Sequence, residues 1–299
     1  MSKNQNWQKL LVLVMLVALL PVLLCGCGRR SSSRRNLDAP RRRNSGSAST
    51  TMETRTPATT PPSPTVLPRA TGPSEPKQNT QQEPLIYNDS RVPNYVATDP
   101  QWKTLRFDWE CQDRMGTAWM ELTLDVQMYN HYHALSRYHG VENYHKYINE
   151  ANNAQVVRQV VEALRDVANA LHYDDAAVAR EMAKFVQDCI TYEYDSDTTG
   201  QDEFPRYPIE TLYERRGDCE DTSILMAALL KEWGYEVGFL HLPGHVAVGL
   251  RTSDDYNRGD YYEINGHRYL YIESTGSGWN IGEIPDDCKK AQAEFHLIP

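Results

Sequence analysis

The chain has 299 residues and a formal net charge of −9 at pH 7, but the charge is divided unevenly along it. Residues 1–90 hold 12 of the 31 basic and 5 of the 40 acidic residues, which leaves 19 basic against 35 acidic side chains to the remainder. A strongly acidic body argues against nucleic acid as the partner of the folded part. Residues 91–299 have a suitable length for one globular domain with a hydrophobic core.

Residues 1–27 have the features of an export signal. Lys3 and Lys9 give a weakly positive start, and residues 10–24 are apolar apart from Pro21. This apolar stretch of 15 residues is shorter than the roughly 20 that a membrane-spanning helix needs, and it suits the apolar region of a signal peptide.

The sequence Leu-Cys-Gly-Cys at residues 24–27 resembles the bacterial lipobox, whose last cysteine is lipidated and becomes the new N-terminus. The resemblance implies that Cys27 is the lipidated residue. The alternative is an uncleaved N-terminal membrane anchor, because four arginines within residues 29–35 favour a cytoplasmic location for that flank. Either interpretation places the protein at the cell membrane, and we expect the domain on its extracytoplasmic face.

Residues 28–90 are rich in Ser, Thr, Pro and Arg and lack aliphatic periodicity. Such a segment buries too little apolar surface to offset the entropy of ordering, so we predict a disordered linker. The linker would act as a spacer that holds the domain away from the membrane.

The domain is predicted to begin with a β-hairpin. Apolar and polar residues alternate over residues 105–111 and again over 118–124, and a turn-like sequence separates the two runs. Two helices should follow. Residues 156–171 place their apolar side chains on one helical stripe, and a second helix starts after Asp174 and Asp175.

Another helix is predicted to begin at Cys219 and to end at Gly234, which suits the left-handed position after a helix. Apolar residues cover nearly its whole circumference, so this helix should be buried. An antiparallel sheet is predicted to follow it, and the resulting arrangement belongs to the α+β class. The predicted strands comprise residues 236–242, 245–251, 261–264 and 269–274.

Three short segments offer the side chains of a nucleophilic catalyst. They are the Gly-Asp-Cys that ends at Cys219, the Gly-His-Val-Ala around His245, and the Glu-Ser-Thr that begins at Glu273. A thiol, an imidazole and a carboxylate are the nucleophile, the base and the group that orients the base in cysteine-dependent acyl transfer. We therefore predict Cys219, His245 and Glu273 as the catalytic residues.

The predicted positions of these residues suit their roles. Asp218 can cap the helix that Cys219 starts, and the free N–H groups of the first turn favour a thiolate and can bind an oxyanion. His245 is expected to project from a strand start toward this helix end, with Glu273 on the next long strand accepting from its other ring nitrogen. Singly, each of the three is more often structural, and their ordered occurrence is what supports catalysis.

These motifs resemble the transglutaminase-like superfamily, whose members share a papain-like core. The resemblance covers about residues 185–285, with Cys219 in the position of the family nucleophile and His245 in that of the family histidine. The third family residue is usually Asp, and here it is Glu273. The resemblance implies a buried nucleophile helix packed on an antiparallel sheet.

The superfamily includes transglutaminases, peptidases, peptide N-glycanases and non-enzymatic relatives. The resemblance implies an enzyme for thiol-dependent acyl transfer on an amide of a protein or peptide, foremost a peptidase. The N-terminal motifs add the expectation that this enzyme is membrane-anchored and extracytoplasmic. A protein-glutamine transglutaminase and a non-catalytic module that binds peptide or cell-wall polymer remain alternatives.

In one branch of the family, the periplasmic cysteine proteases, acidic residues beside the nucleophile bind Ca²⁺, and Asp218, Glu220 and Asp221 resemble that feature. Hard oxygen ligands suit Ca²⁺. The alternative is that these acids only stabilise the helix start through its dipole. Tyr207, in a segment that is also similar to bacterial members, is a candidate for the oxyanion hole.

Two other groups of side chains need an interpretation. The four histidines within residues 131–145 lie among tyrosines at a spacing that matches no metal site, so an aromatic helix or surface groove is preferred. In an exported domain, two of the remaining cysteines can form a disulfide, and the sequence does not choose the pair. These cysteines are Cys111, Cys189 and Cys288.

Overall fold

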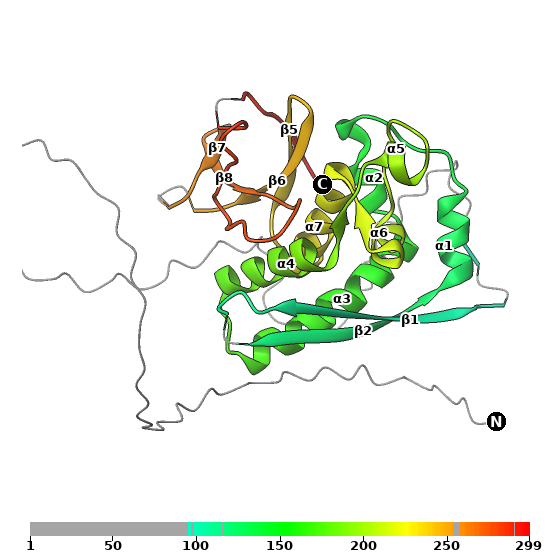
Figure 1. Cartoon of the computed structure of the whole chain (residues 1–299). Coiled ribbons are helices and arrows are strands. Elements are labelled where there is room, and N and C mark those ends of the chain that lie inside the picture. Colours follow the sequence, from blue (N-terminus) through cyan, green and yellow to red (C-terminus); the bar gives the residue numbers. More distant parts are fainter. Residues whose placement is uncertain (1–94, 97–98, 115, 254–257, 290) are drawn as a thin grey trace, which may run out of the picture. The chain divides into compact units, whose positions relative to one another are not determined.

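In the computed structural model, a β-hairpin and a group of helices precede a C-terminal antiparallel sheet (Figure 1). The predicted export signal of residues 1–27, with its candidate lipidation site Cys27, and the predicted linker of residues 28–90 lie outside the described residues. Among the described helices, none combines the length and the apolar character that crossing a membrane requires. The described residues are 95–96, 99–114, 116–253, 258–289 and 291–299.

A two-stranded antiparallel hairpin opens the domain. β1 (Trp102–Glu110) pairs with β2 (Thr117–Asp125) along its whole length, and Phe107 lies opposite Met120. Alternate residues of both strands are buried against the helices that follow. The alternation in the sequence therefore predicted this hairpin correctly.

Two long amphipathic helices, α3 (Ala151–Ala170) and α4 (Asp175–Cys189), lie where the apolar stripes predict them. Glu150 and Asp174 cap them, each accepting a hydrogen bond from a backbone amide of the first turn. Three shorter helices precede α3. They are α1 (Val126–His133), the 3-10 helix η1 (Val141–Asn143) and α2 (His145–Ile148).

The segment between α4 and the central helix holds structure that periodicity did not reveal. α5 (Asp195–Thr198) and α6 (Pro208–Glu214) have four and seven residues, too few to show a helical period. β3 (Thr191–Tyr192) pairs in parallel with β4 (Arg216–Gly217). This pairing brings the chain that leaves α4 beside the residues that precede Cys219.

The central helix α7 (Cys219–Trp233) begins and ends where the sequence predicts. Gly234 ends it with a φ of 108°, a left-handed conformation that favours glycine. Residues 220–230 are all buried, because α7 packs against α3, α4 and α6 as well as the C-terminal sheet (Figure 1).

A five-stranded antiparallel sheet in the order β7-β8-β6-β5-β9 completes the domain. Four strands lie within two residues of their predicted bounds. A fifth strand, β9 (Glu294–Leu297), pairs with β5 at the sheet edge and was not predicted. Helices followed by an antiparallel sheet confirm the α+β class. The four predicted strands are β5 (Val237–Leu242), β6 (His245–Arg251), β7 (Tyr261–Ile264) and β8 (His267–Ile272).

Candidate active site

Cys219 is the first residue of α7 and directly follows the N-cap Asp218. The cap is a reciprocal capping box, in which Asp221 Oδ2 accepts a hydrogen bond of 3.3 Å from the backbone amide of Asp218. Gly217 is required before it, because a Cβ atom at that position would lie 2.5 Å from Asp221 Cβ. The Gly-Asp-Cys sequence thus sets the thiol at the start of a buried helix.

His245 begins β6, directly after a turn in which Gly244 has a φ of 71°. The next residue, Val246, contacts α7 through both of its backbone groups. Its amide donates to the thiol of Cys219, and its carbonyl accepts from Ser223 Oγ at 2.9 Å. The sulfur therefore lies beside the backbone of the residue that follows His245.

Glu273 lies directly after β8 rather than on a strand, which corrects the prediction. Its buried carboxylate accepts hydrogen bonds from Tyr271 Oη at 2.7 Å and from the amide and Oγ1 of Thr275 at 3.0 and 2.6 Å. His245 Nε2 lies 3.0 Å from Glu273 Oε2. Because an ionised carboxylate only accepts, Nε2 carries the proton and Nδ1 is the basic atom of the ring.

The hydrogen bonds decide the charge of Glu273. Burial alone would favour the neutral carboxyl group and raise its pKa. The hydrogen bond and the charge of His245, together with the hydrogen bonds from Thr275 and Tyr271, outweigh burial and lower the pKa of Glu273. The carboxylate is thus ionised and able to orient the imidazole.

Buried hydroxyl groups tie the end of β8 to α7. Ser274 Oγ lies 2.9 Å from Thr222 Oγ1 and 3.1 Å from Ser223 Oγ. Gln187 of α4 donates to the backbone carbonyl of Glu273 at 2.8 Å. These contacts fix the carboxylate relative to the helix that carries the thiol.

The electrostatic environment of the thiol differs from the prediction. Burial raises the pKa of Cys219, and the charge of Glu220 raises it further, against the lowering effect of the Val246 amide. The thiol donates to Glu220 Oε2 over 3.3 Å, and among the described residues no hydrogen bond joins it to His245. The predicted stabilisation of a thiolate is therefore wrong for this arrangement, because the first turn of α7 is buried and acidic.

Three buried carboxylates gather near the helix start. Asp195, Asp218 and Glu220 each offer an oxygen atom, and these atoms lie within 4.8 Å of one another. Burial raises the pKa of Asp218 and of Glu220, and the neighbouring Asp218 raises the pKa of Glu220 further. Asp218 Oδ1 is buried and has no hydrogen-bond partner within the described part of the chain. This donor set fits a hard cation such as Ca²⁺.

Asp221, the third predicted Ca²⁺ ligand, is engaged elsewhere. Its carboxylate pairs with the fully buried guanidinium of Arg206, which also pairs with Asp195. Asp218 and Glu220 thus fit a cation site. Asp195 adds an oxygen atom to the same cluster, although it also pairs with Arg206 and accepts a hydrogen bond from the amide of Phe204. Sequence reasoning missed Asp195 because it lies outside any motif and reaches the helix start only through the fold of α5.

Two tyrosines near the start of α7 also escaped the sequence analysis. Tyr192 lies opposite Gly217 in the β3–β4 pair, two residues before Cys219. Burial raises the pKa of Tyr192, and the charge of Cys219 raises it further. Tyr192 packs edge to face on Tyr194, with ring centroids 5.3 Å apart, and the two side chains are 38% and 61% exposed. An exposed aromatic pair therefore lies near the start of α7.

Tyr207 has a different environment. It is buried at the N-cap of α6, and its ring centroid lies 4.8 Å from that of Tyr132 and 4.6 Å from that of Tyr147. These contacts give Tyr207 a packing role and lend no support to a place in an oxyanion hole.

The other predicted groups are structural. His133 stacks on Tyr129 with ring centroids 5.4 Å apart and lies 3.0 Å from Glu210, so the predicted aromatic cluster is present. The disulfide that the sequence left open is not formed, because the described cysteines are all free thiols. They are Cys111, Cys189, Cys219 and Cys288.

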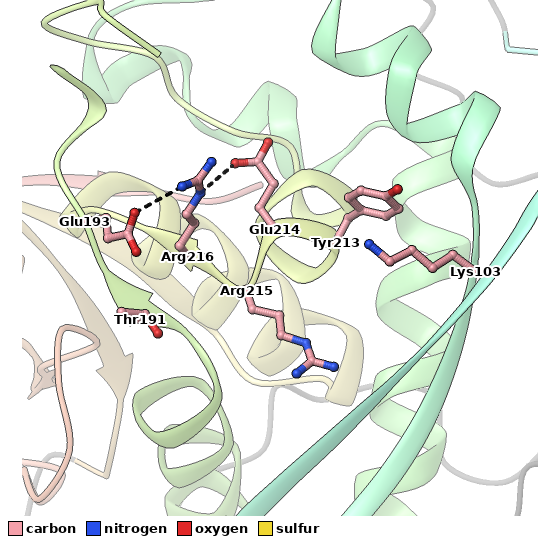
Figure 2. Close-up of a pocket in the computed structure, with 7 residues that line it drawn as sticks. All are labelled: Lys103, Thr191, Glu193, Tyr213, Glu214, Arg215 and Arg216. Atoms are coloured by element: carbon pink, nitrogen blue, oxygen red, sulfur yellow. Dashed lines mark hydrogen bonds and ion pairs between the residues drawn. The ribbon is translucent and has the colours of Figure 1, made fainter. Parts of the chain in front are cut away.

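A pocket of about 420 Å³ lies beside the β3–β4 pair. Figure 2 shows Arg216 between two carboxylates, and it lies 3.2 Å from Glu193 and 3.3 Å from Glu214. None of Cys219, His245 and Glu273 lines this pocket, so we assign it no part in the reaction. Its lining consists of Lys103, Thr191, Glu193, Tyr213, Glu214, Arg215 and Arg216.

Comparison with protein families bears on this site. The family model of the transglutaminase-like superfamily core matches residues 162–248. The match includes Cys219 and His245 and ends before Glu273. A search of curated proteins found no match.

Proposed function

We propose that this protein, whose residues 162–248 match the family model of the transglutaminase-like superfamily, is a cysteine-dependent enzyme that transfers the acyl group of an amide, foremost by hydrolysing peptides. In this proposal Cys219 is the nucleophile, His245 is the base and acid, and Glu273 orients His245. The observation that carries it is the 3.0 Å pair of His245 Nε2 and Glu273 Oε2 beside the helix start that holds the thiol. A buried α7 packed on an antiparallel sheet supports a papain-like arrangement.

In the proposed reaction the thiol exchanges its hydrogen bond to Glu220 for one to His245 Nδ1, which takes the proton. The sulfur attacks the carbonyl carbon of the amide, and the carbonyl oxygen becomes an oxyanion. The backbone N–H of Cys219 can bind it, because the first N–H groups of a helix lack helical acceptors. His245 then gives its proton to the departing amine, the C–N bond breaks, and a thioester remains.

Water resolves the thioester. Its oxygen attacks the acyl carbon as His245 Nδ1 takes one of its protons, the C–S bond breaks, and the sulfur regains the proton. Glu273 stabilises the imidazolium in both halves of the reaction. An amine in place of water would form a new amide, so the acceptor distinguishes a peptidase from a transglutaminase.

The surface near the start of α7 suits a protein or peptide substrate. Tyr192 and Tyr194 expose aromatic rings there, and such rings supply apolar contact area together with a hydroxyl group. We place a side chain of the substrate against this pair while its carbonyl carbon reaches Cys219.

One observation favours a non-catalytic module that binds peptide or cell-wall polymer. The pKa of Cys219 is raised by burial and by Glu220, and a neutral thiol is a poor nucleophile. In that alternative the fold persists and the three predicted catalytic side chains never act together.

A peptide library incubated with the full chain tests the function. We expect new N-termini with the wild type and with Cys189→Ala, and none with Cys219→Ala. Incorporation of a labelled amine without new N-termini would indicate a transglutaminase. Binding without either product would replace the proposed enzyme by the binding module.

The acid cluster extends the proposal to Ca²⁺. Asp195, Asp218 and Glu220 would hold the ion, whose charge offsets the negative charge that raises the pKa of Cys219. We expect iodoacetamide to alkylate Cys219 faster in Ca²⁺ than in EGTA, and Asp218→Asn to remove the difference. Equal rates in both solutions would exclude a role for Ca²⁺.

The N-terminal motifs support attachment of the enzyme to the extracytoplasmic face of the cell membrane. We propose that Cys27 carries the lipid. Metabolic labelling with an alkyne fatty acid should mark the wild type and not Cys27→Ala. Membrane association of unlabelled wild-type protein would instead indicate the N-terminal anchor.

A further inference from the structure

We propose that His241, Glu294 and His296 form a site for a divalent transition-metal ion of the Zn²⁺ class at the edge of the sheet. Strand register brings them together. His241 on β5 lies directly opposite Glu294 on β9, and His296 is two residues further along β9. Because side chains alternate along a strand, all three project from the same face.

The ligand atoms already lie close to one another. Glu294 Oε2 is 4.0 Å from His241 Nδ1, and Glu294 Oε1 is 3.2 Å from His296 Nε2. One atom from each side chain lies within 4.8 Å of the others. Zn–N and Zn–O bonds of about 2.0–2.2 Å would place tetrahedral ligand atoms roughly 3.3–3.6 Å apart. The side chains of His241 and Glu294 are 47% and 69% exposed, so they can close the remaining gap.

His296 supplies the observation that points to an ion. Its Nε2 atom is shielded from solvent and forms no hydrogen bond of normal geometry within the described residues, although a carboxylate oxygen of Glu294 lies nearby. Buried ring nitrogens normally have a hydrogen-bond partner. A metal ion would bind His296 Nε2 and the carboxylate of Glu294 at once.

The donor set selects the kind of ion. Two imidazoles and one carboxylate suit Zn²⁺ and its transition-metal neighbours, whereas Ca²⁺ prefers oxygen ligands alone. Three protein ligands at an exposed edge leave a fourth position for water. The site shares no residue with Cys219, His245 and Glu273 or with the acid cluster, so it does not depend on the proposed function. A bound ion would hold β9 on β5 and stabilise the fold.

Metal titration of the full chain, without an affinity tag and stripped with EDTA, tests this site. Co²⁺ serves as a spectroscopic probe, because its visible bands report tetrahedral coordination and a near-ultraviolet charge-transfer band appears only with a thiolate ligand. We expect one ion per chain with no thiolate band, competition by Zn²⁺, and a melting temperature that Zn²⁺ raises.

Substitutions make the test specific. His241→Ala and His296→Ala should each weaken Zn²⁺ binding at least about tenfold, and they should abolish the Zn²⁺-dependent rise in melting temperature. His267→Ala, on the exposed start of β8, is the matched control and should bind like the wild type. If His296→Ala does not fold, His241→Ala decides alone, because that side chain is about half exposed. A thiolate band, binding that survives His241→Ala, or no binding at micromolar metal would overturn the site.

Discussion

The buried carboxylate that pairs with His245 and the buried carboxylates at the start of α7 behave differently. On the sheet side, Glu273 accepts hydrogen bonds from Tyr271 and Thr275 and pairs with His245, and its pKa is lowered. On the helix side, burial raises the pKa of Asp218 and of Glu220, the charge of Asp195 raises that of Asp218 further, and Asp218 raises that of Glu220 further. Burial is common to both, so the supply of donors and positive charge makes the difference.

This contrast shows that the sheet side of the site has a catalytic arrangement and the helix side does not yet have one. The sheet side already holds an ionised carboxylate and an oriented imidazole. The helix side holds a thiol whose hydrogen bond goes to Glu220 at 3.3 Å. In our account, the reaction begins when charge on the helix side is neutralised and the thiol turns to His245.

The largest expected effect comes from a substitution on the sheet side of the site. Glu273→Gln removes the charge that stabilises the imidazolium, so hydrolysis of the peptides that the library identifies should fall on the order of 10²–10⁴-fold. Glu273→Asp keeps the charge and should retain more activity than Glu273→Gln. Wild-type rates in Glu273→Gln would show that the carboxylate does not orient a catalytic histidine.

The next effect concerns stability on the helix side. Arg206→Met leaves the fully buried carboxylates of Asp195 and Asp221 without their cation, which should cost about 3–5 kcal/mol in urea unfolding. Arg158→Met is the matched control, because the Arg158 side chain, which pairs with Glu232, is 55% exposed. That control should cost less than about 1 kcal/mol. Equal losses would contradict the buried role of Arg206.

A smaller effect is expected on the thiol itself. Glu220→Gln removes a charge that opposes ionisation, so the apparent pKa of Cys219 should fall by about one unit or more. The pKa is obtained from the alkylation rate between pH 6 and 11. Glu193→Gln changes the charge by the same amount at a residue that pairs with Arg216, and it should leave the thiol unchanged. An unchanged pKa of Cys219 in Glu220→Gln would show that the charge of Glu220 does not oppose ionisation of the thiol.

The smallest effect is the pH dependence of unfolding, where the two sides have opposite signs. The pKa of Glu273 is lowered in the fold. Its contribution to the free energy of unfolding is therefore present above its pKa in the unfolded chain, about 4.3, and is lost as pH falls. The pKa of Glu220 is raised in the fold. Its contribution to the free energy of unfolding is therefore present below its pKa in the unfolded chain and is lost as pH rises. Urea midpoints between pH 3 and 8 should therefore show a weaker acid loss in Glu273→Gln and a weaker loss toward pH 8 in Glu220→Gln. Parallel curves for both variants would contradict these signs.

Strong periodicity made much of the fold predictable. The hairpin, α3, α4 and α7 each bury a long regular face, and β6 starts at His245 as predicted. α6 was missed because seven residues are too few to show a helical period. β9 was also missed, although the equally short β7 was predicted. Glu273 was placed on a strand because the apolar run of β8 continues up to it.

The site was predictable as a set of side chains and not as an electrostatic environment. Motif order indicated Cys219, His245 and Glu273, but the pKa of the thiol depends on burial and on acids that only the fold brings together. Asp195 is 24 residues before Cys219 in the chain and reaches the acid cluster through α5. No local pattern could have shown that Asp221 would pair with Arg206.

The alkylation rate of Cys219 in the wild type and in His245→Ala tests most directly whether the imidazole of His245 activates the thiol. Iodoacetamide at pH 7 with site-resolved mass spectrometry gives this rate, and Cys288 in the same chain serves as the internal reference. We expect the rate at Cys219 to fall at least about tenfold in His245→Ala, while the rate at Cys288 should not change. Equal rates at Cys219 in the two proteins would show that the imidazole does not act on the thiol.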